Sequence, residues 1–449
     1  RFDYIAKVEA LASQSYADMA LYLAKLLFDE VDATALERVV RDAYDFQVGL
    51  RQFDDKVSTL ELFHGPTHAF KDFGARFMGR MTGLLNKQGE LIILTATSGD
   101  TGKAALEGYK DIERIKIMVF YPVDGVSRVQ KLQMATQTGS NVNVCAIRGN
   151  FDDAQSGVKR IFTDKAIAEK LAENSMAFSS ANSINWGRLC PQIVYYFSAY
   201  CDLLASGEIK AGDEINVVVP TGNFGNILAA YYAREMGLPI KKLICASNSN
   251  SVLTEFLTTG VYNRNREFFT TISPSMDILI SSNLERLLYS VSGSENVKKW
   301  MKELNEDGKY EVDAATLESI KALFDAGCCD DTETKATIAD VFKNKDYLCD
   351  THTAVAVKVY YDYKAKTGDT TPAVIASTAS PFKFSEAVLE AVAGGTEGLD
   401  EFEMVERLAA VTGRTCPEQL ANLRDKAVRF DGCCSKDKMD GVVFGMLGI

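Results

Sequence analysis

The chain has 449 residues, of which 47% are hydrophobic and 24% are charged, a composition typical of globular proteins rather than of disordered or fibrous ones. The formal net charge of −12 argues against nucleic acid or an anionic membrane as a partner, because both bind clustered Lys and Arg. The sequence also lacks an apolar run of the length that spans a bilayer.

The ten cysteines are scattered without C-x-x-C spacing, and only three histidines accompany them. This pattern predicts free thiols in a reducing compartment and no metal site. We therefore expect a cytoplasmic protein, or an organellar one if a transit peptide has been removed. The first residue is Arg1 rather than Met, so we expect a mature form, a fragment or a trimmed form of a longer protein.

In chain order, residues 1–56 are predicted to be mainly helical, with a capping box at Ser15–Asp18 ahead of an apolar stripe at helical spacing. From residue 57 onward strands and helices alternate, which predicts a parallel α/β fold. The expected strands include 91–94, 115–121, 142–147, 215–219, 242–246 and 373–376. A charged helical insertion is expected at about 293–345, and the chain after Pro381 is predicted to be mainly helical.

The turn Thr221–Asn226 joins the clearest predicted strand, 215–219, to a helix. Its two glycines, Gly222 and Gly225, allow backbone N–H groups to point at an anion, and the helix N-terminus adds positive potential. A phosphate or a carboxylate fits such a turn. A turn that only packs the helix is the alternative, and the segment matches neither Walker A nor G-x-G-x-x-G.

A second loop, Ser98–Gly102, has the same strand–loop–helix setting. Ser98 and Thr101 add hydroxyl donors to the backbone amides, which suits the carboxylate of a substrate. The alternative is a plain helix N-cap, with Asp100 near the start of the helix.

Lys71 lies in the segment Phe63–Gly74, beside Phe70 and Phe73. Apolar surroundings favour a neutral amine, which imine formation requires. An exposed helix lysine is the alternative. One lysine amine, one phosphate turn and one carboxylate loop are together the parts of a pyridoxal-phosphate (PLP) enzyme that acts on an amino acid.

Seven segments, in this order over nearly the whole chain, resemble threonine synthase in the long form found in many bacteria and fungi. They are Leu62–Asp72, Ala96–Gly102, Ser183–Arg188, Pro220–Asn226, Ser273–Asn283, Asp350–Val355 and Ser377–Pro381. The resemblance implies the α/β class called PLP-dependent fold type II, which is similar to the tryptophan synthase β subunit. It has two α/β domains with parallel-rich sheets, the cofactor between them, and an N-terminal helical part. The expected division is 1–56 for the helical part, 57–94 with 190–449 for the large PLP-binding domain, and 95–189 for the small domain.

The resemblance also implies the cofactor residues. Lys71 is then the catalytic lysine that bonds the cofactor, and Thr378 stands at the pyridine nitrogen, where a neutral hydroxyl leaves the ring a milder electron sink than a carboxylate does. The backbone amides of the turn are expected to hold the PLP phosphate; they belong to Gly222, Asn223, Phe224, Gly225 and Asn226. Some relatives carry Asp at position 226, an exchange that a backbone-held phosphate tolerates.

For the substrate, the resemblance points to Ser98, Asp100 and Thr101 as contacts to its carboxylate or to the cofactor edge. Asn185 and Arg188 are candidates for its phosphate, because an Arg fork matches phosphate oxygens. A surface salt bridge is the alternative for Arg188. His352 lies in a matching segment without an assigned step.

The implied reaction converts O-phospho-L-homoserine and water into L-threonine and phosphate by γ-elimination and β-addition of water, the last step of threonine biosynthesis, catalysed by a carbon–oxygen lyase. The alternatives are a threonine-synthase-like phospho-lyase that gives 2-oxobutyrate, a dehydratase of the same fold, and a catalytically silent PLP-binding protein. A monomer or homodimer is expected.

Overall fold

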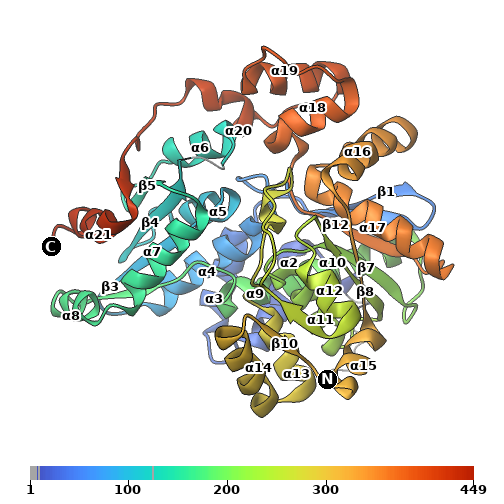
Figure 1. Ribbon diagram of the computed structural model, residues 1–449, viewed down its shortest axis with the longest axis horizontal. Helices are drawn as coiled ribbons and strands as arrows, with labels where there is room; N and C mark the ends of the chain where they lie inside the picture. The colour runs from blue at the N-terminus through green and yellow to red at the C-terminus, as the bar shows by residue number, and fades with distance from the viewer. Residues whose placement is uncertain (1–7, 9–10, 124–125) are drawn as a thin grey trace. The chain divides into compact units, whose positions relative to one another are not determined.

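The computed structural model describes residues 8, 11–123 and 126–449, and the chain forms two compact units. Unit 1 contains Val48–Phe63 and Gln192–Glu397, together with the described residues up to Met19. Unit 2 contains Ala20–Gln47, His64–Pro191 and Gly398–Ile449. Each unit has its own sheet covered by helices (Figure 1).

The boundary between the units falls within α2 (Tyr16–Leu27). The helices of unit 1 are α10 (Ile193–Ser206), α11 (Gly225–Glu235), α12 (Val252–Thr259), α13 (Leu284–Ser292), α14 (Ser294–Glu306), α15 (Ala314–Leu323), α16 (Asp331–Lys345), α17 (Thr351–Thr367) and α18 (Ser385–Ala393). Those of unit 2 are α3 (Ala33–Ala43), α4 (Lys71–Leu85), α5 (Asp100–Tyr109), α6 (Arg128–Ala135), α7 (Phe151–Thr163), α8 (Lys165–Glu173), α9 (Trp186–Leu189), α19 (Glu401–Thr412), α20 (Glu418–Ala421) and α21 (Met439–Leu447).

The sheet of unit 1 is parallel except for one edge hairpin. Its strands, in spatial order, are β1 (Gly49–Asp54), β2 (Val57–Glu61), β12 (Ala373–Ser377), β7 (Ile215–Pro220), β8 (Ile240–Ser247) and β11 (Phe324–Cys328). β1 runs antiparallel to β2, and all other pairs are parallel. β7 and β12 are buried throughout, as expected for central strands of a sheet with both faces covered. A separate antiparallel pair consists of β9 (Val261–Asn263) and β10 (Lys309–Glu311).

The sheet of unit 2 is wholly parallel, with the spatial order β13 (Cys433–Ser435), β5 (Val142–Arg148), β4 (Ile115–Pro122), β3 (Glu90–Ala96) and β6 (Met176–Ser179). Alternate residues of its strands supply two cores, because side chains point to opposite faces in turn. Ile92 and Leu94 pack with α7, α8 and α21, whereas Ile93 packs with α4, α5 and α6.

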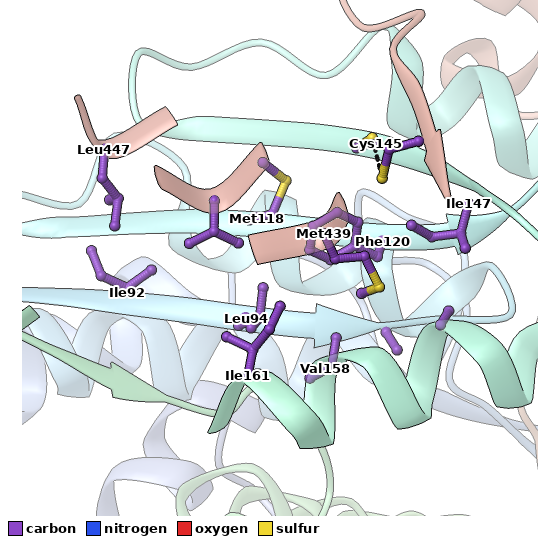
Figure 2. Close-up of a cluster of buried hydrophobic side chains, with 14 of the residues drawn as sticks. Ile92, Leu94, Met118, Phe120, Cys145, Ile147, Val158, Ile161, Met439 and Leu447 are labelled. Carbon is purple, nitrogen blue, oxygen red and sulfur yellow. Dashed lines mark hydrogen bonds between the residues drawn. The ribbon is translucent and has the colours of Figure 1, made fainter. Parts of the chain in front are cut away.

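The C-terminal segment corrects the predicted domain division, which placed 190–449 together in the large domain. Gly398–Ile449 belongs to unit 2, because β13 pairs with β5 and α21 packs on the same sheet. Figure 2 shows Met439 of α21 among Met118, Phe120 and Ile161 of this core. A Cβ at Gly157 of α7 would meet the Met439 sulfur, so the Met439 side chain lies directly on this glycine.

Other parts of the prediction also differ from the structure. Residues 49–54, within the part expected to be helical, form the strand β1 of unit 1, and residues 20–47 belong to unit 2. Of the predicted large-domain segment 57–94, only residues up to Phe63 lie in unit 1, because α4 packs on α5 and β3 pairs with β4 in unit 2. The insertion expected to be helical contains β11, which pairs in parallel with β8. β11 is an edge strand whose sequence, Phe-Asp-Ala-Gly-Cys, has no continuous apolar run.

The close packing of α4 on α5 fixes the start of one helix relative to the start of the other. A Cβ at Gly79 would collide with the carbonyl oxygen of Gly108, and a Cβ at Gly108 would collide with that of Ala75. The two helices therefore approach more closely than larger residues permit. Within the described part of the chain, every helix is too short or too polar to traverse a bilayer.

Candidate functional site

Lys71 begins α4, and a buried carboxylate shapes the loop that leads to it. Asp72 accepts hydrogen bonds from the Thr67 N–H (2.9 Å) and the Thr67 hydroxyl (2.7 Å). A Cβ at Gly65 would lie 2.5 Å from Asp72 Oδ2, so the loop requires glycine there. The Lys71 side chain is 10% exposed, which does not fit the alternative of an exposed helix lysine.

The amine of Lys71 faces the carboxylate of Asp100. Lys71 Nζ lies 3.7 Å from Asp100 Oδ2, and Gln130 Nε2 donates to Asp100 Oδ1 at 3.0 Å. Asp100 is buried, so its charge acts on Lys71 with little screening by water. Gln130 orients the carboxylate, and the carboxylate stabilises the ammonium form of Lys71.

The Ser98–Gly102 loop uses part of its own backbone hydrogen-bonding capacity. The Thr97 hydroxyl accepts from the N–H groups of Gly99 (2.9 Å) and Gly102 (2.8 Å). Gly99 has φ of 135°, and a Cβ there would lie 2.5 Å from Gln130 Cδ. The carboxylate of Asp100 would repel an anionic substrate, and two of the N–H groups are already bonded to Thr97. The hydroxyls of Ser98 and Thr101 are therefore the side-chain groups of this loop that suit an anion.

Arg188 and Thr101, both predicted to contact substrate, lie together in unit 2. Arg188 Nη2 donates to Thr101 Oγ1 at 3.4 Å, and Nη1 donates to the Ala181 carbonyl at 2.6 Å. Burial lowers the pKa of Arg188 to about 10, and its side chain remains charged at neutral pH. Because Arg188 is buried, the alternative of a surface salt bridge is wrong.

Asn185 has a structural task in the turn before Arg188. It is the N-cap of α9: its Oδ1 accepts from the Gly187 N–H (3.0 Å), and its Nδ2 donates to the Ser180 carbonyl (3.2 Å). A Cβ at Gly74 of α4 would collide with the Arg188 carbonyl oxygen, so α4 packs directly on this turn. Asn185 therefore positions the segment that carries Arg188.

In unit 1, the turn after β7 presents backbone N–H groups at the start of α11. The N-cap is Phe224, with φ of 62°, and no side chain caps the helix there. The first N–H groups of a helix lack acceptors within it, so those of Gly225 and Asn226 are suited to an anion. A left-handed conformation is costly for a bulky residue. Phe224 is held in it by burial and by stacking on Phe324, with ring centroids 5.8 Å apart.

A second segment of unit 1 supports this turn from behind. A Cβ at Gly222 would collide with the Ser275 carbonyl oxygen, so only glycine fits against the backbone at Ser275. Asn283 Nδ2 donates to the Asn223 carbonyl at 3.0 Å. Both supporting residues come from Ser273–Asn283, one of the segments that carry the sequence resemblance.

The Asn226 side chain points toward α10. Its Oδ1 accepts from the hydroxyls of Tyr195 (2.8 Å) and Tyr196, and among the described residues its buried Nδ2 has no hydrogen-bond partner. An Asp at this position would accept the same two hydroxyls without an unsatisfied donor. This geometry fits the expectation that Asp and Asn are both tolerated, since only the backbone N–H of residue 226 is available to the turn.

Thr378 lies beside the turn at the same edge of the sheet. β12 and β7 are hydrogen-bonded neighbours with Ile375 opposite Val218. Thr378 and Thr221 stand three residues beyond that pair, at the carboxyl ends of the two strands. Ligands of α/β sheets bind at such ends.

These features fit PLP in each unit taken by itself. Unit 1 supplies backbone N–H groups that suit a phosphate. At the end of the neighbouring strand it also supplies the Thr378 hydroxyl, which suits a ring nitrogen. Unit 2 supplies a largely buried lysine amine with a carboxylate partner.

Sequence reasoning missed the supporting residues Asp72, Gln130, Ser275 and Asn283. A sequence signal existed for Gln130, since Ser127 and Gln130 form the capping box of α6. That signal marks a helix start and says nothing of the bond to Asp100. The other three lie in the resembling segments, but their partners come from the fold.

Comparison with known proteins identifies the family of the chain. Residues 58–378 match the family described as pyridoxal-phosphate dependent enzyme, and residues 353–439 match the threonine synthase C-terminal family. The chain is 39% identical to the threonine synthase of Pseudomonas aeruginosa over 391 residues, which is 85% of this chain and 80% of that protein. It is also 39% identical to human threonine synthase-like 1 over 402 residues, 86% of this chain and 54% of that protein. The chain thus spans about half the length of the threonine synthase-like 1 relatives that it matches.

Among solved structures, the PLP-bound threonine synthase from Brucella melitensis superposes with a TM-score of 0.86 at 37% identity, covering 98% of this chain and 90% of that chain. The predicted family, the fold type II class and the cofactor PLP are confirmed by these matches. The chain belongs to the threonine synthase family of pyridoxal-phosphate dependent enzymes.

Proposed function

We propose that this protein is a threonine synthase, a carbon–oxygen lyase that converts O-phospho-L-homoserine and water into L-threonine and phosphate. The observation that carries the proposal is the Lys71–Asp100 pair at the starts of α4 and α5, with Nζ and Oδ2 3.7 Å apart. A largely buried amine that faces one carboxylate is suited to exchange protons, because the carboxylate stabilises the charge that forms when the amine accepts one. Family membership supplies the reaction class.

We propose that the residues singled out by the resemblance have the cofactor roles that it implies. The turn would hold the phosphate through the backbone amides of Gly222, Asn223, Phe224, Gly225 and Asn226. Lys71 would bond the cofactor, and Thr378 would donate to or accept from the ring nitrogen. The chemistry that PLP supplies when bound is withdrawal of electrons from the carbons of an attached amino acid.

The proton movements fall to Lys71. Over the reaction the Cγ–O bond breaks, one Cβ proton is replaced by the hydroxyl of water, and Cγ gains a proton. We propose that the Lys71 amine, once displaced by the substrate, removes the α proton and carries the others. Asp100 would stabilise the ammonium that each removal creates, and Gln130 would hold Asp100 in place.

Substrate binding would use the remaining predicted residues. Arg188 is proposed to bind the substrate phosphate, and Ser98 and Thr101 its carboxylate; Thr101 also accepts a hydrogen bond from Arg188. Asn185 would act by positioning the turn that carries Arg188. A cytoplasmic location and a monomeric or dimeric state belong to the same proposal.

The test is to incubate the purified protein with PLP and O-phospho-L-homoserine and to identify the carbon product. L-Threonine with one phosphate released per turnover is the expected result. Formation of 2-oxobutyrate and ammonia would assign the protein as a phospho-lyase instead. Cofactor binding without turnover would indicate a silent binder.

The role of Lys71 is tested separately. Borohydride reduction of the holoprotein, followed by digestion and mass spectrometry, should find the pyridoxyl group on Lys71. Lys71→Ala should lose this label and lower kcat by about 10³-fold or more. Lys87→Ala, at an exposed position in the same unit, is the matched control and should behave as wild type. A label on another lysine would overturn the assignment.

A further inference from the structure

A buried network of polar side chains lies at the start of α17 in unit 1, centred on Asp350. Asp350 is the N-cap of α17 and accepts from the N–H groups of His352 (2.9 Å) and Thr353 (3.3 Å). The Thr353 hydroxyl also donates to Asp350 Oδ2. Each of these three residues is at most 3% exposed. Water is thus largely excluded from the network.

One arm of the network ends at Ser275. His352 Nδ1 lies 2.9 Å from Asp350 Oδ1, and the Ser275 N–H donates to His352 Nε2 at 3.2 Å. Because Nε2 accepts, the ring proton sits on Nδ1 and is donated to Asp350. The ring also packs edge-on against Phe384, with centroids 4.8 Å apart, which fixes its orientation.

The other arm ends at Ser377. Thr353 Oγ1 and Ser377 Oγ lie 3.1 Å apart, as do Ser377 Oγ and the Tyr347 hydroxyl. Since Thr353 gives its hydrogen to Asp350, Ser377 donates to Thr353, and Tyr347 then donates to Ser377. Every hydrogen in both arms points toward Asp350, so the four bonds to its oxygens require a carboxylate that only accepts.

The ends of the two arms adjoin the two cofactor contacts of unit 1. The Ser275 carbonyl lies against Gly222 of the turn, where a Cβ would collide with it. Ser377 is the last residue of β12 and directly precedes Thr378. One carboxylate therefore braces the segment behind the phosphate turn and the residue before Thr378.

We infer that His352 and Asp350 are positioning residues that hold the phosphate turn and Thr378 at a fixed separation, so that one PLP molecule spans both. His352 acts on the phosphate end through Ser275, and Thr353 acts on the ring end through Ser377. The inference rests on the proposed function in one respect, that PLP binds at the turn and at Thr378.

The first experiment separates the two ends by using PLP and pyridoxal, which lacks the phosphate, as probes for the apoprotein. His352→Leu removes the acceptor for Ser275 and should raise the Kd for PLP about tenfold while leaving the Kd for pyridoxal within about twofold, since a lost buried bond costs roughly a factor of ten. His352→Gln keeps an acceptor near the Nε2 position and should recover most of the loss.

The second experiment addresses the ring end. Thr353→Val keeps the side-chain shape but removes the hydroxyl between Asp350 and Ser377, so the Kd values for PLP and pyridoxal should rise by the same factor, about fivefold. Thr334→Val is the matched control: Thr334 is also buried in unit 1 and bonds Asp330 and Cys329 instead. It should leave both Kd values unchanged.

Urea unfolding of each apoprotein separates positioning from a general loss of stability. If His352→Leu and Thr353→Val lower stability but leave both Kd values of the folded protein unchanged, the inference is wrong. It is also wrong if the ratio of the two Kd values does not change in His352→Leu. Failure of the wild type to bind PLP would instead overturn the proposed function.

Discussion

Each unit has a loop between a parallel strand and a helix, but the two loops present groups of opposite charge preference. In unit 1 the turn after β7 has no side-chain cap, so the first N–H groups of α11 receive no acceptor from a capping side chain. In unit 2 the loop after β3 satisfies two of its own N–H groups with Thr97 and places the carboxylate of Asp100 at the start of the helix. The first turn suits a phosphate, whereas the carboxylate of the second loop suits an amine. A glycine-containing loop before a helix is therefore not by itself an anion site. Whether it can bind an anion depends on whether nearby side chains already accept hydrogen bonds from its backbone N–H groups.

The largest expected effect comes from filling the space behind the unit 1 turn. Gly222→Val would force the turn away from Ser275, and overpacking costs about 3 kcal/mol, so the affinity for PLP should fall at least roughly a hundredfold. Titration of the apoprotein with PLP measures this affinity. Gly49→Ala, where a Cβ meets nothing within 4 Å, is the control. Unchanged affinity would mean that the turn does not hold the cofactor.

A second prediction concerns the C-terminal helix α21, which completes the core of unit 2. Met439→Ala should lower the free energy of unfolding by about 3 kcal/mol, because it leaves a cavity between α21 and the sheet of unit 2. Urea denaturation provides the measurement. Val411→Ala, at an exposed site of α19, should change stability by less than about 0.5 kcal/mol. Equal effects of the two changes would show that α21 is not part of this core.

The third prediction sharpens the contrast between the loops. Asp100→Asn keeps the shape but removes the charge opposite Lys71, so kcat should fall roughly thirtyfold, about 2 kcal/mol, whereas PLP affinity stays within about threefold. Steady-state kinetics and cofactor titration separate the two effects, and the exposed change Glu113→Gln is the control. A loss of affinity without a loss of kcat would assign Asp100 to cofactor binding.

The smallest expected effect is a pH dependence of stability in unit 1. Burial raises the pKa of Asp202 to about 6, so the folded protein binds a proton more tightly there than the unfolded chain, whose carboxyl has a pKa of about 3.9. The stability of the wild type relative to Asp202→Asn is highest below about pH 4 and is lost as the pH rises through 6.

Above that pH the variant should be the more stable protein by about 1 kcal/mol, a value reduced for partial exposure of the carboxyl. Urea unfolding at pH 4 and pH 8 gives the comparison, with the exposed change Asp340→Asn as control. A difference that does not vary with pH would show that Asp202 titrates as an ordinary surface carboxyl.

The alternation of strands and helices, and the loops that follow the strands, were accessible from the sequence because they are local. Buried strands such as 215–219 are apolar runs, and the turn at Thr221–Asn226 needs glycine in a short stretch of chain. The candidate site residues Lys71 and Asp100 came from such local segments, whereas Thr378 came from the family resemblance. Their roles stay predictions until tested chemically.

The pairings across the chain were decided by the tertiary structure alone. β13 joins β5 although about 290 residues separate Cys145 from Cys434 along the chain, and three residues give too little pattern to identify a strand. Gln130 meets Asp100, and His352 meets Ser275, only after the helices that carry them have packed. Periodicity and turn chemistry act over a few residues, whereas a buried hydrogen bond depends on which surfaces the whole core brings together.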